Sequence, residues 1–140
     1  MPEESSAPDL VELGRRAIEC AGRGDLDEAM TVYGPDSVWD LSTVGLGTYR
    51  GVEVIRAMIE DWMSAYETFD LEIEEMNDLG GGVTLAVTLQ RGRPRGSSGL
   101  VQLHYATVTQ WADGLITHAT HYADVDEART AAQRLAEKQR

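Results

Sequence analysis

Cysteine is almost absent: the chain of 140 residues has one, Cys20, so it cannot form a disulfide within itself. Cys20 stands in a helix-like stretch with Ala17 and Ile18, and no neighbouring charge would stabilise a thiolate. A buried, inert thiol is therefore favoured over a reactive nucleophile. A lone unpaired cysteine is typical of a reducing compartment, and we expect a cytoplasmic protein.

Long apolar runs are also missing. No segment approaches the roughly 20 apolar residues that cross a bilayer. The first residues, Met1 to Ser6, are acidic and lack the basic start and apolar core of a signal peptide. We therefore expect no association with a membrane.

Basic residues are scarce, with 12 Lys and Arg against 24 Asp and Glu and a formal net charge of −12. Nucleic-acid binding needs clustered cations, so we expect no nucleic-acid partner. The one basic cluster, Arg91 to Arg95, lies in a Gly-, Pro- and Ser-rich stretch that is typical of an exposed turn.

Metal-ligand patterns are absent as well. His118 and His121 are three residues apart in a predicted strand, so their side chains leave opposite faces and cannot chelate one ion. The sequence thus predicts neither a metal site nor a cofactor.

The residues that are present form an ordinary globular pattern, with 42% hydrophobic and 26% charged residues in the length of one domain. Residues 8–136 are predicted to form this domain, with flexible tails at residues 1–7 and 137–140. Helical periodicity predicts a first helix from Leu10, a second from Leu26 to Tyr33, and a third that carries Ile55, Met58, Ile59, Trp62 and Tyr66 on one stripe.

From Phe69 onward the hydrophobic period changes from helical to two, which predicts strands. These strands are separated by Gly80 to Gly82, by the Arg-rich loop and by Asp113-Gly114, and a last helix begins near Asp124. The acidic row Asp70, Glu72, Glu74 cannot be buried unpaired, so we expect it to be solvated and to meet Arg91 and Arg93. Helices first and an antiparallel meander second indicate the α+β class.

Three segments resemble the NTF2-like superfamily, and in particular its SnoaL-like (polyketide cyclase-like) members. They are residues 33–40, residues 49–55, and the hairpin 111–116 with residues 122–124. The resemblance implies a cone-shaped, curled antiparallel sheet wrapped by N-terminal helices around a central cavity. It also implies a small-molecule ligand, because that fold hosts cyclases, isomerases, dehydratases, epoxide hydrolases and plain binding proteins.

The facing of His121 depends on the turn at Asp113-Gly114. A two-residue turn pairs Trp111 with Ile116, whereas a three-residue loop pairs Trp111 with Leu115 and sets His121 opposite Tyr105. We favour the three-residue loop. The resemblance then places His121 where SnoaL-like cyclases carry their acid/base carboxylate, and a neutral imidazole can act as a general base. The alternative is a structural histidine satisfied by Tyr105 or a backbone carbonyl.

Other candidate site residues follow from the same comparison. The base of the ketosteroid isomerases of this fold falls at or beside Asp40, and their oxyanion-hole acid falls at Thr107. Asp124 is either a carboxylate at the cavity mouth or the N-cap of the last helix, and the N-cap is favoured. The aromatic side chains are expected to be core residues, some of them lining the cavity: Trp39, Trp62, Tyr66, Tyr105 and Trp111. The predicted ligand-binding residues are Trp39, Trp62, Tyr66, Thr107 and Trp111.

The leading hypothesis is acid/base catalysis at carbon, of the cyclase, isomerase or dehydratase type, on a partly apolar ring-containing substrate. His121 would be the base, with Tyr105 and Asp40 polarising the substrate. The rival is a non-catalytic ligand-binding or dimerisation module. An epoxide hydrolase would need an Asp-Arg-Asp set, for which no central Arg is found. A homodimer is expected because Ala106 and Val108 put apolar residues on a second sheet face.

Overall fold

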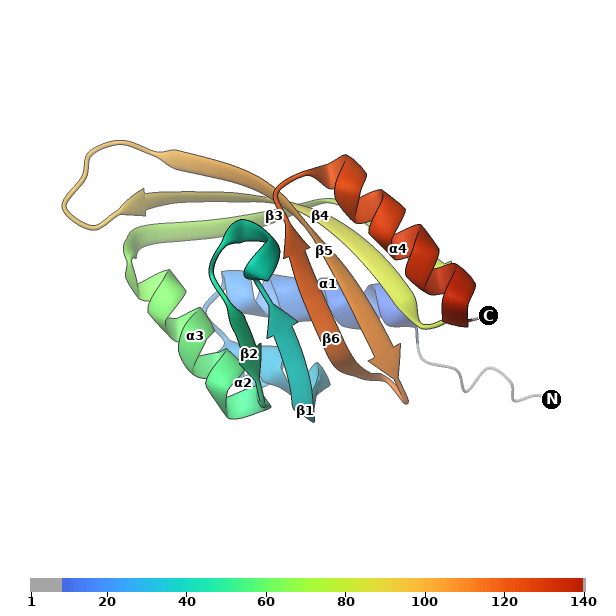
Figure 1. Ribbon diagram of the computed structural model, residues 1–140. Helices are drawn as coiled ribbons and strands as arrows, with labels where there is room; N and C mark the ends of the chain where they lie inside the picture. Colours follow the sequence, from blue (N-terminus) through green and yellow to red (C-terminus); the bar gives the residue numbers. More distant parts are fainter. Residues whose placement is uncertain (1–8, 140) are drawn as a thin grey trace.

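A single antiparallel-rich sheet of six strands, in the order β2-β1-β6-β5-β4-β3, is the frame of the computed structural model, which describes residues 9–139 (Figure 1). The first six strands and helices are α1 (Leu10–Gly22), α2 (Leu26–Ala29), β1 (Tyr33–Asp40), β2 (Thr48–Arg50), α3 (Val52–Ser64) and β3 (Tyr66–Gly80). The others are β4 (Val83–Pro94), β5 (Val101–Ala112), β6 (Leu115–Tyr122) and α4 (Val125–Gln139), and the short 3₁₀ turns are η2 (Met30–Val32) and η3 (Ser42–Val44). The α+β class and the predicted order of helices before an antiparallel meander are confirmed.

The second helix is shorter than predicted. It ends at Ala29, a 3₁₀ turn follows, and Tyr33 is already the first residue of β1. The reason is local: a residue that precedes proline disfavours the helical region, and Gly34 precedes Pro35. Consequently Tyr33 enters the sheet, where its ring can reach the interior.

The third helix is confirmed, although it stops before Tyr66. Its last residue is Ser64, and Tyr66 opens β3. Tyr66, Thr68 and Phe69 are aromatic or β-branched, which favours an extended chain. Ile55 is fully buried, and Met58, Ile59 and Trp62 pack against the same core cluster.

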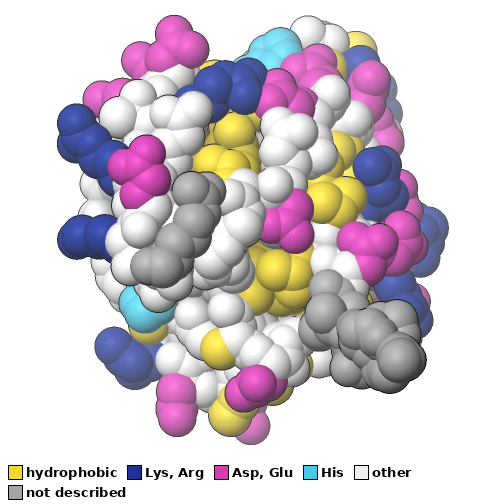
Figure 2. Space-filling model, turned by 90° about the vertical axis from the view of Figure 1, so that its right-hand side faces the viewer, with side chains coloured by type: hydrophobic (Ala, Val, Ile, Leu, Met, Phe, Trp, Pro, Cys, Tyr) yellow, Lys and Arg dark blue, Asp and Glu magenta, His cyan; other side chains and the backbone are white. Residues whose placement is uncertain are grey.

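The acidic row on β3 is exposed and paired, as expected. Arg91 on β4 contacts Asp70 at 3.2 Å and Glu72 at 2.6 Å. Arg93 contacts Glu67 at 3.4 Å instead of Asp70. On the face shown in Figure 2, Lys and Arg side chains also stand beside Asp and Glu, so the described part of that face has no extended basic area.

The last hairpin contradicts the three-residue loop. Asp113 and Gly114 have φ angles of 55° and 79°, so both are left-handed, as in a two-residue type I′ turn. Trp111 therefore pairs with Ile116. Aspartate tolerates this conformation, which removes the need for a longer loop. A bulge next to Trp111 then shifts the register by one residue, so that His121 lies opposite Thr107 rather than Tyr105.

The C-terminal helix covers the outer face of β4 and β5 (Figure 1). Ala128, Ala132 and Ala136 are fully buried against Ala106 and Val108, which are 0% and 1% exposed. The apolar face that prompted the expectation of a homodimer is thus covered within the chain itself, so this reason for a dimer fails. The helix runs to Gln139, so residues 137–139 form its last turn, while residues 1–8 and 140 lie outside the described part.

The helices of the described residues are all too short or too polar to span a bilayer.

Candidate functional site

A cavity with a free volume of about 120 Å³ lies between the concave face of the sheet and the helices α1 and α3. Every strand from β3 to β6 contributes to its wall, as does β1. Its apolar lining includes Gly14, Ala17, Ile18, Ala21, Ala29, Met30, Ile59, Met63, Phe69, Leu71, Met76, Ala86, Ile116 and Ala119. Trp39, Trp62 and Trp111 add aromatic surface, so the three tryptophans predicted as ligand-binding residues all border the cavity.

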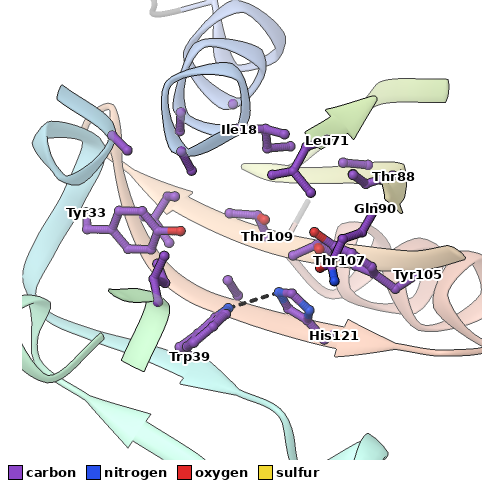
Figure 3. Close-up of a pocket in the computed structure, with 18 of the residues that line it drawn as sticks. Ile18, Tyr33, Trp39, Leu71, Thr88, Gln90, Tyr105, Thr107, Thr109 and His121 are labelled. Atoms are coloured by element: carbon purple, nitrogen blue, oxygen red, sulfur yellow. Dashed lines mark hydrogen bonds between the residues drawn. The ribbon is translucent and has the colours of Figure 1, made fainter. Parts of the chain in front are cut away.

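The polar groups of the cavity are all uncharged at neutral pH. Among the described residues, no Asp, Glu, Lys or Arg lines it. The polar side chains that do are Tyr33, Thr88, Gln90, Tyr105, Thr107, Thr109 and His121. Figure 3 shows Tyr33 on one side of the cavity and His121, Thr107, Gln90 and Tyr105 gathered on the other.

His121 is the imidazole of the site, and two aromatic rings hold it. The indole nitrogen Nε1 of Trp39 donates a hydrogen bond to its Nε2 atom at 2.9 Å (Figure 3). The imidazole stacks on the ring of Tyr105, with a centroid distance of 4.9 Å and an interplanar angle of 14°. Burial lowers the pKa of His121 to about 4. The ring is therefore neutral at pH 7.

Two phenols face the same space. Burial raises the pKa of Tyr33 to about 12. Burial, and secondarily the nearby Tyr33, raises the pKa of Tyr105 above its usual value. Both hydroxyls stay protonated near neutral pH, and neither has a hydrogen-bond partner among residues 9–139. They can donate to a ligand oxygen.

Gln90 is held by its neighbours. Its Oε1 atom accepts from Trp62 Nε1 at 3.2 Å, and its Nε2 atom donates to the hydroxyl of Tyr66 at 3.2 Å. Tyr66 itself does not line the cavity. The structure therefore gives Tyr66 an indirect place behind Gln90, not the ligand contact predicted from sequence.

Thr88 lies beside Gln90 on β4 and is 1% exposed. Its Oγ1 atom has no hydrogen-bond partner in the described structure. A buried hydroxyl without a partner is costly, and Thr88 borders the cavity. A bound polar ligand group is one way to satisfy it.

Asp40 is not brought to the cavity. Trp39 points inward, so the next side chain along β1 leaves the opposite face. The Oδ1 atom of Asp40 accepts from the backbone nitrogen of Ser42 at 2.9 Å, from Ser42 Oγ at 2.6 Å and from Thr48 Oγ1 at 3.2 Å. The hydrogen bonds from Ser42 are the main cause that lowers the pKa of Asp40. Its environment is that of a loop cap.

Asp124 is the N-cap of α4, as favoured from the sequence. Its Oδ1 atom accepts from the backbone nitrogens of Asp126 and Glu127 at 2.9 and 3.2 Å. It does not line the cavity that holds His121.

Sequence reasoning missed Tyr33, Thr88, Gln90 and Thr109. The alternation of β4 did contain the signal, because Thr84, Ala86, Thr88 and Gln90 alternate with Leu85, Val87 and Leu89. In the structure Leu85 and Val87 pack in the cluster under α4, whereas Ala86, Thr88 and Gln90 face the cavity. Which face of β4 lines the cavity depends on where α4 packs, and the sequence pattern of β4 does not give the position of α4.

The sequence model of the SnoaL-like domain family matches residues 15–119, which is most of the chain. The chain belongs to the SnoaL-like family. The matched region begins within α1, contains the three cavity tryptophans, Tyr105 and Thr107, and stops two residues before His121. No curated protein matches the sequence.

Solved structures agree on the fold of this SnoaL-like protein. A hypothetical protein from Catenulispora acidiphila with a ketosteroid isomerase-like fold, in complex with trimethylamine, superposes with a TM-score of 0.70 at 16% identity, covering 84% of this chain and 86% of that one. An LEH-like epoxide hydrolase of M. tuberculosis superposes with a TM-score of 0.69 at 19% identity, covering 89% of this chain and 90% of that one. A candidate SnoaL-like polyketide cyclase of Shewanella denitrificans superposes with a TM-score of 0.69 at 18% identity, covering 91% of this chain and 98% of that one. At these identities the likeness is one of fold.

Proposed function

We propose that this SnoaL-like protein binds a small, uncharged, largely apolar molecule that carries at least one oxygen acceptor. The observation that carries the proposal is the cavity itself: an apolar wall, no charged side chain among the described lining residues, and several neutral donors without protein partners. Sites of this kind, mostly apolar with a few placed polar groups, are typical of small-molecule pockets.

The size of the cavity limits the ligand. An apolar cavity of about 150 Å³ takes up benzene, and this one has a free volume of about 120 Å³. A single ring or a short branched chain fits on this scale, whereas a fused polycyclic molecule requires the helices to move. The three tryptophans favour a flat ring.

The charge of the cavity limits the ligand further. A carboxylate that entered would lose its water and would find neither Lys nor Arg among the described lining residues. A ketone, ester or phenol needs only a hydrogen-bond donor, which Tyr33 and Tyr105 supply.

Acetophenone and benzoate test this, because they have nearly the same shape and differ in charge. We expect acetophenone to shift the NMR signals of the cavity side chains and to bind with at least about tenfold higher affinity than benzoate, a difference of about 1.4 kcal/mol. Equal binding of the two would contradict the charge argument.

The variant Ala86→Met places a longer side chain in the cavity wall, where Ala86 is 3% exposed. We expect acetophenone affinity to fall at least about tenfold, while circular dichroism reports an intact fold. Ala57→Met, on the exposed side of α3, is the matched control and should bind like the wild type. Unchanged affinity in Ala86→Met would place the ligand elsewhere.

Acid/base catalysis at carbon, of the cyclase, isomerase or dehydratase type, is the second candidate function, and His121 in the cavity is the observation that favours it. It ranks second because the described lining contains no carboxylate and the Nε2 lone pair of His121 is already engaged by Trp39. In such an enzyme His121→Asn would lower turnover by roughly 10²–10⁴. In a binding protein it would change affinity alone, which is the result we expect. The epoxide-hydrolase alternative lacks its Asp-Arg-Asp set among these residues.

A further inference from the structure

The hydrogen bond between Trp39 and His121 fixes where the imidazole carries its proton. An indole nitrogen only donates, so Nε2 of His121 must offer its lone pair. A neutral imidazole has one N–H, and that proton must therefore be on Nδ1. Nδ1 has no hydrogen-bond partner among the described residues.

Trp39 is not able to turn away easily from this bond. It is 6% exposed on β1, and its backbone pairs with Ala119 of β6, two residues before His121. Its ring packs against Tyr49 and Trp62, each with a centroid distance of 6.4 Å. The indole meets the imidazole edge to face, at 84° and 5.3 Å.

We infer that Trp39 is a positioning residue that holds His121 as the neutral Nδ1–H tautomer, so that His121 offers its ligand a hydrogen-bond donor and no proton acceptor. Protonation of Nε2 would set one N–H against another, which disfavours the charged ring. The partners that surround the imidazole are neutral: Tyr105 and Thr107 on β5, Trp39 on β1, and Thr43 in η3, whose hydroxyl donates to the backbone oxygen of His121.

The inference deepens the proposed binding function, on which it rests only for the nature of the ligand. With Tyr33, Tyr105 and Nδ1–H as donors, the matching ligand group is a carbonyl or ether oxygen, and a ligand that can only donate hydrogen bonds is disfavoured. The tautomer itself is a property of the ligand-free protein, so it can be tested even if no ligand is found.

The test is ¹⁵N NMR of the labelled wild-type protein at pH 7. We expect His121 Nδ1 to resonate as a protonated ring nitrogen and Nε2 as an unprotonated one, with a scalar coupling across the hydrogen bond between Trp39 Nε1 and His121 Nε2. A protonated Nε2 in the wild type would overturn the inference without reference to any variant.

Trp39→Phe keeps an aromatic ring and removes the N–H. We expect the Nε2–H tautomer to become populated and the pKa of His121 to rise by about one unit or more, because the donor that opposed protonation is gone. Trp62→Phe is the matched control, since Trp62 also packs on Trp39 but donates to Gln90. It should leave the tautomer of His121 unchanged.

If Trp39→Phe folds and leaves both tautomer and pKa as in the wild type, Trp39 only fills space and the inference fails. If Trp39→Phe does not fold, the coupling across the hydrogen bond in the wild type decides. Absence of acetophenone binding with the Nδ1–H tautomer present would refute the proposed function and leave the role of Trp39 standing.

Discussion

Replacing Ile55 by alanine is expected to lower the free energy of unfolding by about 2–5 kcal/mol, the usual cost of truncating a large buried aliphatic side chain. Ile55 lies on the inner side of α3 and is 0% exposed. It packs in one cluster with Trp39 and with Leu41, which is also 0% exposed. The truncation leaves a space under α3 that these rigid neighbours cannot close.

The neighbouring Val54→Ala is the matched control. Val54 is on the same helix and is 49% exposed, so we expect its truncation to change the unfolding free energy by less than about 0.5 kcal/mol. Urea denaturation followed by circular dichroism measures both. Equal effects of the two variants would contradict the packing of α3 against the sheet.

Lowering the pH from 7 to 5 is expected to destabilise the protein by about 2 kcal/mol through His121 alone. In the unfolded chain this histidine titrates near 6.5, whereas burial lowers the pKa in the folded protein to about 4. Between these values the unfolded state binds a proton that the folded state does not. Stability therefore falls as the pH falls through this window, and the contribution vanishes above pH 7.

His121→Asn isolates this effect, because asparagine can accept the bond from Trp39 but does not titrate. The difference in unfolding free energy between wild type and variant should shrink or reverse towards pH 5. The pKa values of Asp40 and Glu75 are lowered from their ordinary values of 3.8 and 4.5. Protonation of these two carboxylates therefore destabilises the folded protein mainly below about pH 5. Parallel pH profiles for the two proteins would show that His121 is not buried as neutral imidazole.

Ile55 and His121, the residues of these two predictions, belong to the same site: His121 lines the cavity and Ile55 lies behind its wall. Ile55 supports the wall that carries Trp39, and Trp39 in turn orients His121. A variant that loosens α3 is therefore expected to disturb the imidazole without touching it. Because burial lowers the pKa of His121, a measured pKa for this residue reports how well the cavity excludes water.

Much of this architecture was determined by the sequence alone. Apolar spacing predicted α1, α3 and the strands, because amphipathic periodicity is a local property of the chain. The resemblance of residues 33–40, 49–55 and 111–116 with 122–124 led to the SnoaL-like family, and the family match bears this out. The cavity positions of Trp39, Trp62 and Trp111 were likewise expected from their aromatic character.

The facing of individual strand residues could not be determined in this way. Asp40 was a candidate catalyst, but one step along β1 separates it from Trp39 and sends it to the opposite face. Two local features make the hairpin register differ from the predicted one: the type I′ turn at Asp113-Gly114 and the bulge beside Trp111. A shift of one residue exchanges the two faces of a strand, so small local events decide which side chains meet.

His121, Tyr105 and Thr107 were predicted site residues, but the other polar groups of the cavity were found only in the tertiary structure. On β4 both faces are buried, one under α4 and one around the cavity, and alternation alone cannot say which is which. These polar groups come from three strands that are far apart in the chain: Tyr33 from β1, Thr88 and Gln90 from β4, and His121 from β6. The sequence determined the helices and strands because their patterns are local. The folded sheet decided the site, because the chemistry of the site depends on which strand faces converge and on the Trp39 hydrogen bond that orients His121.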